Sequence, residues 1–318
     1  MMEIEVNRNS HLIDPAMHIW GWEIPVYLFL GGLAAGMMIL SAVMALRDVD
    51  GRRSTWARLA PFAAPILLSV GMAALFADLE FKTHVYRFYL ALRVSSPMSW
   101  GSWILLGIYP ATILLGLASL TEKERVALTS WNPRCPVVVG QTLDRLWRWS
   151  RANVAALAKV NIALGILLGG YTGVLLGTLA ARAAWNSLLL APLFLVSGLS
   201  TGAALFMLLP VSDDEHHRLR RWDLMAIGVE ALLLAMFFVA LAGGGGQPGR
   251  DAAALFFGGP FTAVFWALVV AVGLLVPALL EVLESRLGLR PARLAPVLIL
   301  IGGLSLRWIL VLAGQVSV

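Results

Sequence analysis

Three parts of this sequence carry side chains that can donate hydrogen bonds or exchange protons. These side chains are phenols, carboxyls and an imidazole, set in otherwise apolar sequence. They are Glu23 and Tyr27, then Asp78, Glu80 and His84, and finally Tyr171. A phenol donates a hydrogen bond, whereas a carboxyl or imidazole accepts and releases a proton. Together these residue types suit a site that binds an oxygen atom of a ligand and carries its proton.

The elements that must position these groups are eight apolar stretches of membrane-spanning length. A bilayer core needs about 20 apolar residues per helix. The 318 residues are 59% apolar with a mean hydropathy of +0.80, which supports many such helices. The predicted spans are 24–46, 59–79, 101–120, 153–180, 187–210, 223–243, 256–281 and 294–315. The sequence therefore predicts an all-α integral membrane protein with eight transmembrane helices.

Basic residues fall almost entirely on one side of these spans. With the N-terminus outside, the connections after the first, third, fifth and seventh spans hold 16 of the 24 Lys and Arg residues. The outer segments hold six, and the remaining two lie within spans. Positive charge stays in the cytoplasm, so both termini are expected to be extracytoplasmic. The formal charge of +5 thus reflects orientation in the membrane and does not indicate nucleic-acid binding.

This orientation gathers the polar and aromatic residues at the outer face. An interfacial aromatic belt would account for tryptophans such as Trp22 and Trp100. It accounts poorly for Tyr171, which lies about six residues, or ~9 Å, inside the interface. Carboxylates at the end of a span, as at Asp78 and Glu80, need a partner or a purpose. A functional site is therefore predicted at the outer face.

A short internal repeat indicates two helix bundles of the same topology. The Gly-Leu-Ala-Ala-Gly sequence at 32–36 in the first span matches Gly-Leu-Ser-Thr-Gly at 198–202 in the fifth. Both place small residues four apart, which lets helix backbones approach closely in lipid. We predict two four-helix bundles. Residues 1–152 begin the first with three spans and a long cytoplasmic loop, 153–186 complete it with span four, and 187–318 form the second.

Span four carries four glycines spaced by four along one helix face. They are Gly165, Gly169, Gly173 and Gly177. Tight helix packing would explain this spacing. A flat wall against a planar ligand is the alternative.

Three ionisable residues lie deeper in the membrane. Lys159 and Glu230 fall near the inner third of spans four and six, and Arg307 lies past the midpoint of span eight. Charges at this depth usually face a cavity or a partner. Lys159 could instead extend its amine to the interface. For Glu230 and Arg307 we favour an internal polar path.

The residue inventory argues against the common bound redox centres. A transmembrane b-type haem needs two facing histidines at membrane depth, and all five histidines lie in tails or loops. One cysteine, Cys135, cannot hold an iron–sulfur cluster. We therefore expect no haem, no iron–sulfur cluster and no metal in this chain. If the protein moves electrons, the donor and the acceptor come from elsewhere.

Four stretches of the sequence, taken in order, carry a resemblance to a known family. The first is 22–36, which reads Trp-Glu-Ile-Pro-Val-Tyr-Leu-Phe-Leu-Gly-Gly-Leu-Ala-Ala-Gly, and the second is Asp78-Leu79. The third is 96–101, and the fourth combines Tyr171-Thr172-Gly173 with Trp185-Asn186 and 197–202. On these motifs the protein resembles the NrfD/PsrC family, the membrane subunits of polysulfide-reductase-type complexes, over nearly its whole length.

This resemblance implies an eight-helix, cofactor-free subunit that binds quinone in its first bundle. Such a subunit docks an extracytoplasmic iron–sulfur protein, which usually connects to a molybdopterin or other catalytic subunit. The protein would exchange electrons between menaquinone or ubiquinone and that partner within a respiratory oxidoreductase, and would not be catalytic alone. It would reside among the lipids of the cytoplasmic (inner) membrane of a bacterium or archaeon.

The resemblance also implies roles for the residues at the outer face. The predicted catalytic residues are Tyr171, Asp78 and Glu80. The predicted quinone-binding residues are Trp22, Glu23, Tyr27, His84, Trp100 and Tyr171. The Tyr171 phenol would donate to one quinone carbonyl while an imidazole, carboxyl or phenol faces the other. The two acidic residues would accept or supply protons, and the two tryptophans would wall the ring.

The sequence departs from the family pattern in two places. Some members have an Asn and a His near the start of the first span as quinone contacts, where this protein has Glu23, Ile24 and Tyr27. The Gly-x-Pro that often follows Asp-Leu is replaced by residues 80–82, Glu-Phe-Lys. These departures concern the contacts to the quinone ring and the rim of the pocket.

Two other classes of protein fit parts of the sequence. A secondary transporter or proton-translocating membrane protein would suit two equivalent bundles with intramembrane charges. Against it, the sequence has no inverted repeat and no clearly broken mid-membrane helix. A purely structural anchor for a peripheral enzyme is the other class, and Tyr171 would then be dispensable.

Overall fold

The computed structural model describes residues 20–48, 53–79, 82–90, 96–130, 137–179, 181–287 and 293–317, and all regular structure in these ranges is helical. The first part contains α1 (Glu23–Arg47), α2 (Thr55–Leu59), η1 (Ala60–Phe62), α3 (Ala63–Asp78), η2 (Lys82–His84), α4 (Arg87–Leu90), α5 (Pro97–Ser119), α6 (Glu122–Ser130), α7 (Val137–Ala152) and α8 (Val154–Gly177). The second part contains α9 (Leu190–Leu208), α10 (Asp213–Gly244), α11 (Gly246–Ala254), α12 (Thr262–Val264), η3 (Phe265–Leu275), α13 (Val276–Leu287) and α14 (Leu294–Val316).

Eight helical segments are long and apolar enough to cross a membrane, which confirms the predicted all-α membrane fold. The sixth segment differs most at its start, because α10 begins at Asp213, well before the apolar stretch. A capping box begins this helix. Ser212 Oγ accepts a hydrogen bond from Glu215 N, and the Glu215 carboxylate accepts one from Ser212 N at 2.9 Å. These bonds satisfy N–H groups that a helix start leaves unpaired, so the charged sequence continues the helix.

The seventh span begins later than the apolar pattern predicts, at Thr262 instead of residue 256. Gly258 has a φ of +114°, a backbone conformation that side chains with a Cβ rarely adopt. Gly259 and Pro260 follow it. The Gly258 N–H donates to Thr262 Oγ1 at 2.7 Å and ties this turn to the helix start. A turn of this kind cannot be read from hydropathy alone.

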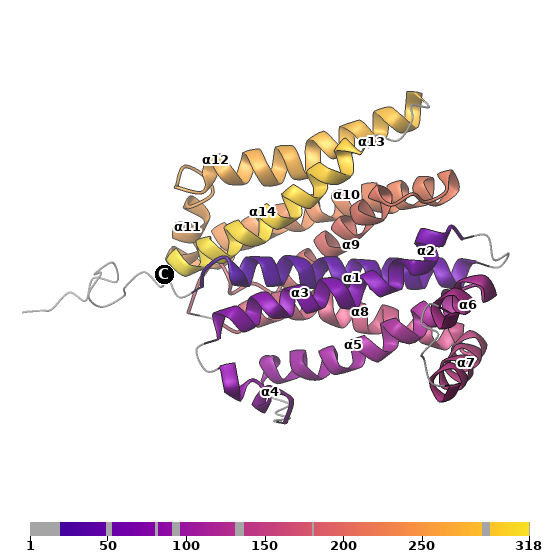
Figure 1. Ribbon diagram of the computed structural model, residues 1–318. Helices are drawn as coiled ribbons and strands as arrows, with labels where there is room; N and C mark the ends of the chain where they lie inside the picture. The colour runs from indigo at the N-terminus through magenta and orange to yellow at the C-terminus, as the bar shows by residue number, and fades with distance from the viewer. Residues whose placement is uncertain are drawn as a thin grey trace, which may run out of the picture.

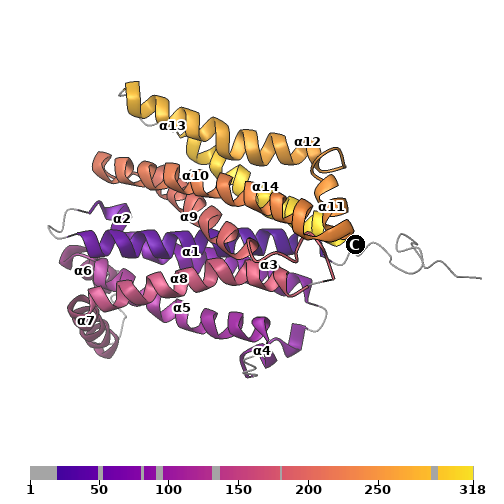
Figure 2. The ribbon, with the colours of Figure 1, turned by 180° about the vertical axis from the view of Figure 1, so that it is seen from behind.

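Helix α1 lies at the centre of the molecule (Figure 1). It packs against α3, α8 and α9, and α9 packs in turn against α8, α10 and α14. Helix α5 packs on α8, while η3 packs on α14. Seen from behind, α12 and α13 lie on the far side of α9 and α10 from α5 (Figure 2).

The two copies of the repeat pack against each other. Gly36 of α1 lies against the backbone of Gly198 and Gly202 of α9, and Gly198 lies against the carbonyl of Gly32. A Cβ at Gly36, Gly198 or Gly202 would overlap the facing backbone. The repeat therefore forms the contact that holds α1 against α9, as small residues four apart do in membrane helices.

The glycine face of α8 also serves helix packing. Gly165 lies against Ile39 of α1, and Gly173 lies against the backbone of Leu190 and Ala191 at the start of α9. A Cβ at Gly165 or Gly173 would come closer than van der Waals contact allows. Packing therefore accounts for Gly165, Gly169 and Gly173, whereas a Cβ at Gly177 would make only ordinary contacts.

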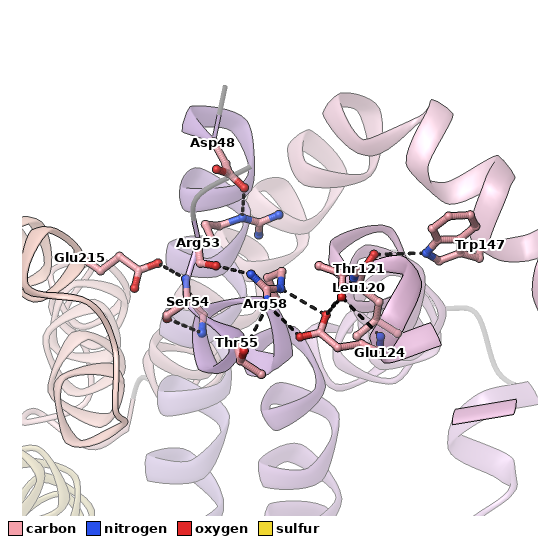
Figure 3. Close-up of polar contacts among 11 residues, drawn as sticks. Asp48, Arg53, Ser54, Thr55, Arg58, Leu120, Thr121, Glu124, Trp147 and Glu215 are labelled. Carbon is pink, nitrogen blue, oxygen red and sulfur yellow. Dashed lines mark hydrogen bonds and ion pairs between the residues drawn. The ribbon is translucent and has the colours of Figure 1, made fainter. Parts of the chain in front are cut away.

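The Arg-rich connections lie at one end of the molecule, which we call the basic face. Helices α2, α6 and α7 lie there, and α4 and α11 lie at the opposite face (Figure 1). A polar network joins the helix ends at the basic face (Figure 3). Arg58 pairs with Glu124 of α6 at 2.8 Å, and Ser54 N donates to Glu215 Oε1 of α10 at 3.0 Å. Trp147 Nε1 of α7 donates to the carbonyl of Leu120, which directly follows α5, at 3.3 Å.

Candidate functional site

A cavity of about 180 Å³ lies between α1, α3, α5, α8 and the segment that carries α4. Helix α4 lies at the face opposite the basic face (Figure 1). Most of its wall is apolar. It is lined by Trp20, Ile24, Tyr27, Leu28, Met72, Leu75, Phe76, Asp78, Leu79, Val85, Tyr89, Gly101, Ser102, Leu105, Tyr171, Leu175 and Leu176. Among the described residues no Lys, Arg or His side chain lines it. A mostly apolar wall with a few polar groups is typical of small-molecule sites.

The polar groups in the wall are three phenols, a hydroxyl and a carboxyl. Tyr27 of α1 and Tyr171 of α8 are both buried and interact through their hydroxyl groups. Tyr89 adds a third phenol, and burial raises its pKa, so that it stays protonated as a donor. Ser102 of α5 and Asp78 of α3 complete the set. The cavity can therefore offer hydrogen-bond donors to ligand oxygens and a carboxyl to receive a proton.

Close packing against α5 holds the Tyr171 ring in place. Its ring and hydroxyl lie directly on Gly101, where a Cβ would overlap them. Gly101 stands in the first turns of α5, which begins at Pro97 and presents no side chain at this point. The absence of a side chain lets the phenol lie between α5 and α8 with its hydroxyl near that of Tyr27.

The end of α3 places Asp78 at the cavity. Asp78 is the last residue of the helix, and Leu79 after it is extended, with φ −68° and ψ 126°. The carboxyl is half-buried, and Glu23 at the start of α1 lies near enough to interact with it electrostatically. Two acidic side chains therefore lie near each other, and one of them, Asp78, lines the cavity.

Contacts from α14 hold Trp20, which forms part of the wall. The Trp20 ring stacks on Trp185 with 5.0 Å between ring centroids. Its backbone N–H donates to Gln315 Oε1, and Gln315 Nε2 donates to the Trp20 carbonyl, each at 3.1 Å. Trp185 is itself buried and donates to the carbonyl of Leu310 at 2.8 Å. This wall of the cavity thus depends on the last span.

The structure brings three of the predicted site residues to the cavity, namely Tyr27, Asp78 and Tyr171. Four others do not line it. They are Trp22, Glu23, His84 and Trp100. Trp22 and Trp100 are 53% and 42% exposed, as expected of tryptophans in an aromatic belt. His84 is also exposed, in η2. Glu80 lies outside the described residues.

Sequence reasoning missed Trp20, Tyr89 and Ser102. Trp20 precedes the first span, and the sequence alone does not show whether Trp20 or Trp22, two residues away, lines the cavity. Tyr89 lies in a connection between spans, where the short helix α4 returns it to the cavity. Ser102 was visible at the start of the third span beside Trp103, but only helix orientation shows which of the two faces inward.

The fold and the cavity define a multi-pass membrane protein with a mostly apolar cavity near one face. The protein belongs to the polysulphide reductase, NrfD family, whose family model matches residues 11–318. It is 32% identical to the protein NrfD of Escherichia coli (strain K12), over 94% of this chain and 96% of that one. It is 28% identical to a polypeptide of the polysulfide reductase of Wolinella succinogenes, over 94% of this chain and 95% of that polypeptide. It is 25% identical to a subunit of the selenate reductase of Mesobacillus selenatarsenatis, over 94% of this chain and 74% of that subunit. The predicted family resemblance is confirmed.

Proposed function

We propose that this protein is the quinone-reactive membrane subunit of a reductase complex. The observation that supports this most is the apolar cavity with Tyr27, Tyr171 and Asp78 in its wall. A quinone is neutral and apolar, and its two carbonyl oxygens accept hydrogen bonds. The absence of a cation among the described lining residues is unfavourable for an anionic substrate.

The wall residues have separate roles in this proposal. The phenol of Tyr171 donates to one quinone oxygen, and Tyr27 or Tyr89 donates to the other. Oxidation of a quinol releases two electrons and two protons, and reduction takes up the same. Asp78 exchanges a proton with the nearer oxygen, and Glu23 beside it passes that proton toward solvent. Glu80 and exposed His84 follow Asp78 in the sequence and extend this route.

The electrons pass to or from another protein in this proposal. The positions of the histidines and the single cysteine argue against a haem or an iron–sulfur cluster in this protein. Two of the relatives are named as components of a polysulfide reductase and a selenate reductase. By analogy we propose an extracytoplasmic ferredoxin-like iron–sulfur partner, joined to a molybdopterin or other catalytic subunit. In this arrangement the cavity lies near the face opposite the basic face and next to that partner. The basic face lies in the cytoplasm, and both termini lie outside. Two four-helix bundles, with the cavity in the first, complete the proposed arrangement.

The test is turnover with a quinol or quinone after replacement of one phenol. Tyr171→Phe keeps the ring on Gly101 and removes the donor, so quinone-linked turnover should fall by about 10²-fold. Assembly and thermal stability of the complex should stay unchanged. Electron transfer within the partner, measured with an artificial donor, should also stay unchanged.

Tyr109→Phe is the matched control, because it removes a phenol on α5 that bonds to Ser69 at 3.0 Å and does not line the cavity. Its turnover should equal that of the parent protein. Full activity of Tyr171→Phe would remove Tyr171 from the mechanism and favour the role of a structural anchor.

A further inference from the structure

Helix α7 lies at the basic face and presents three different sides. The helix packs against α5, and the spacing of three and four residues gives one side to Leu143, Trp147 and Ser150, of which Ser150 is 0% exposed. The second side carries Leu146 and Trp149. These two apolar side chains are 39% and 52% exposed, so the described part of the protein leaves much of their surface uncovered.

The third side of α7 carries arginines spaced by three, which we call the arginine row: Arg145, Arg148 and Arg151. All three are exposed. Side chains three apart are neighbours on a helix, where like charges repel each other. Among the described residues no ion pair joins the row to a carboxylate, and Asp144 in the same helix pairs with Arg125 of α6. The row therefore presents positive charge that the described part of the protein does not neutralise.

The ends of two spans hold α7 at the level of the membrane surface. Trp147 Nε1 donates to the carbonyl of Leu120, the residue after α5, at 3.3 Å. Helix α7 ends at Ala152, and α8 begins at Val154. Both views show α7 running across the direction of the spans (Figure 1, Figure 2). Amphipathic helices in this position lie along the boundary between the lipid headgroups and the apolar core.

Contacts around Trp147 fix the rotation of α7 about its own axis. The Arg125 guanidinium of α6 lies 5.0 Å from the centroid of the Trp147 ring, and the Arg151 guanidinium lies 5.1 Å from the same centroid. The ion pair between Arg125 and Asp144 adds a second link between α6 and α7. The arginine row and the exposed apolar side therefore keep their directions without a ligand, which lowers the conformational entropy lost on binding.

The chemistry of the two exposed sides favours one kind of ligand. A free phosphate would bind the guanidinium groups but would leave Leu146 and Trp149 in water. A zwitterionic lipid would cover the apolar side but brings a positive group beside its phosphate. An anionic phospholipid suits both sides, because its phosphate pairs with arginine while its acyl chain covers the leucine and the tryptophan. Tryptophan is also favoured at the level of the headgroups.

We propose that α7 is a docking surface for anionic phospholipids in the leaflet at the basic face. The arginine row binds the headgroup phosphates, and Leu146 and Trp149 lie among the first carbons of the acyl chains. The lipids screen the repulsion between the arginines and hold α7 against the membrane. This surface lies at the opposite end of α5 from the cavity, and the proposal does not depend on the quinone function.

The first test is native mass spectrometry of the full-length protein in mild detergent, titrated with phosphatidylglycerol. The test variant replaces all three residues of the arginine row by Gln. Each basic residue near an anionic surface contributes about tenfold or slightly less, so the variant should bind phosphatidylglycerol about 10²-fold more weakly. Replacement of the same three residues by Lys keeps the charge and should retain most of the affinity. Phosphatidylcholine should bind the parent protein more weakly than phosphatidylglycerol does.

The matched control removes the same charge from exposed arginines of α10 and α13, through Arg218→Gln, Arg221→Gln and Arg286→Gln together. Its affinity for phosphatidylglycerol should stay near that of the parent protein. An equal loss in both triple variants would overturn the proposal and assign the binding to net charge. Displacement of phosphatidylglycerol by millimolar inorganic phosphate would also overturn it, because the site would then take phosphate without the acyl chains.

The second test needs no arginine variant, so it holds if the triple Gln variant does not fold. The protein is placed in phosphatidylcholine nanodiscs that contain the same small fraction of lipid brominated near the headgroup, either phosphatidylglycerol or phosphatidylcholine. The fluorescence of Trp149 is obtained as the parent signal minus that of Trp149→Phe. Brominated phosphatidylglycerol should quench it more strongly than brominated phosphatidylcholine. Equal quenching by the two lipids, or quenching by neither, would overturn the proposal.

Discussion

The hydroxyl of Tyr171 lies directly over Gly101, so that α8 and α5 meet at the cavity without an intervening side chain. This contact fixes the ring of the proposed hydrogen-bond donor from one side, while Tyr27 faces it from α1. The position of the donor therefore depends on a residue that has no chemistry of its own.

Gly101→Ala should weaken quinone binding without unfolding the protein. The new methyl group must push the Tyr171 ring aside, and the loss of one well-placed hydrogen bond is about 1 kcal/mol, or roughly fivefold in Kd. Gly107→Ala on the same helix is the control, because its Cβ would make only ordinary contact with Leu164 at 3.6 Å. Both changes favour the helix by up to about 1 kcal/mol. Equal quinone affinity in the two variants would show that Gly101 does not position the phenol.

Asp78→Asn should slow turnover while leaving quinone affinity nearly unchanged. The amide keeps the shape of the carboxyl but cannot take a proton, and a positioned general base contributes about 10²-fold or more. The measurement is kcat beside a directly determined Kd. Asp251→Asn in α11 is the control, since this carboxyl near the same face is exposed and bonds only to Gln247 in the described structure. A matching fall in both variants would point to surface charge instead of proton transfer.

Gly36→Ala should lower the thermal stability of the detergent-solubilised protein. Its Cβ meets the Gly198 carbonyl, so α1 and α9 must separate, and overpacking of this kind costs about 1–3 kcal/mol. Gly31→Ala is the control in the same helix, because nothing lies within 4 Å of a Cβ there. Unfolding temperatures of the two variants should therefore shift in opposite directions. A Gly36→Ala protein as stable as Gly31→Ala would contradict the close α1–α9 contact.

A low pH should weaken the polar network of the basic face, because it protonates the Glu124 carboxylate. Its hydrogen bond from Arg58, followed by those from Thr121, holds the pKa of Glu124 at about 2, below its ordinary value of 4.5. A carboxyl with a lowered pKa stabilises the fold fully above that ordinary value and loses this contribution as the pH falls toward about 2. The pair is partly exposed, so we expect a contribution of about 1 kcal/mol.

The measurement for Glu124 is stability against pH for the parent and for Glu124→Gln. The variant should be less stable at pH 7, and the difference should shrink between pH 4.5 and 2. Glu122→Gln is the control, because the Glu122 side chain is 71% exposed in its pair with Arg125 and its loss should change little. A difference that does not depend on pH would assign the effect of Glu124→Gln to packing.

The sequence by itself determined the class of the fold and the family. Apolar length predicts the spans, because a helix must cover the bilayer core whatever its neighbours are. Two of the site residues, Asp78 and Tyr171, stood out because polar groups are costly in apolar spans. Sequence also favoured an internal polar path for Glu230 and Arg307, and the structure shows both buried and interacting.

Only the tertiary structure decided which residues meet. Trp20 lines the cavity in place of Trp22 because α14 holds its backbone through Gln315, a contact across almost the whole sequence. Tyr89 reaches the cavity because the connection after α3 folds back, a turn that leaves no periodic signal in the sequence. The approach of Arg220 to Glu284, at 3.9 Å, depends on how α10 is rotated against α13. Hydropathy fixes the length of a membrane helix, but its rotation and its partners come from side-chain packing between helices.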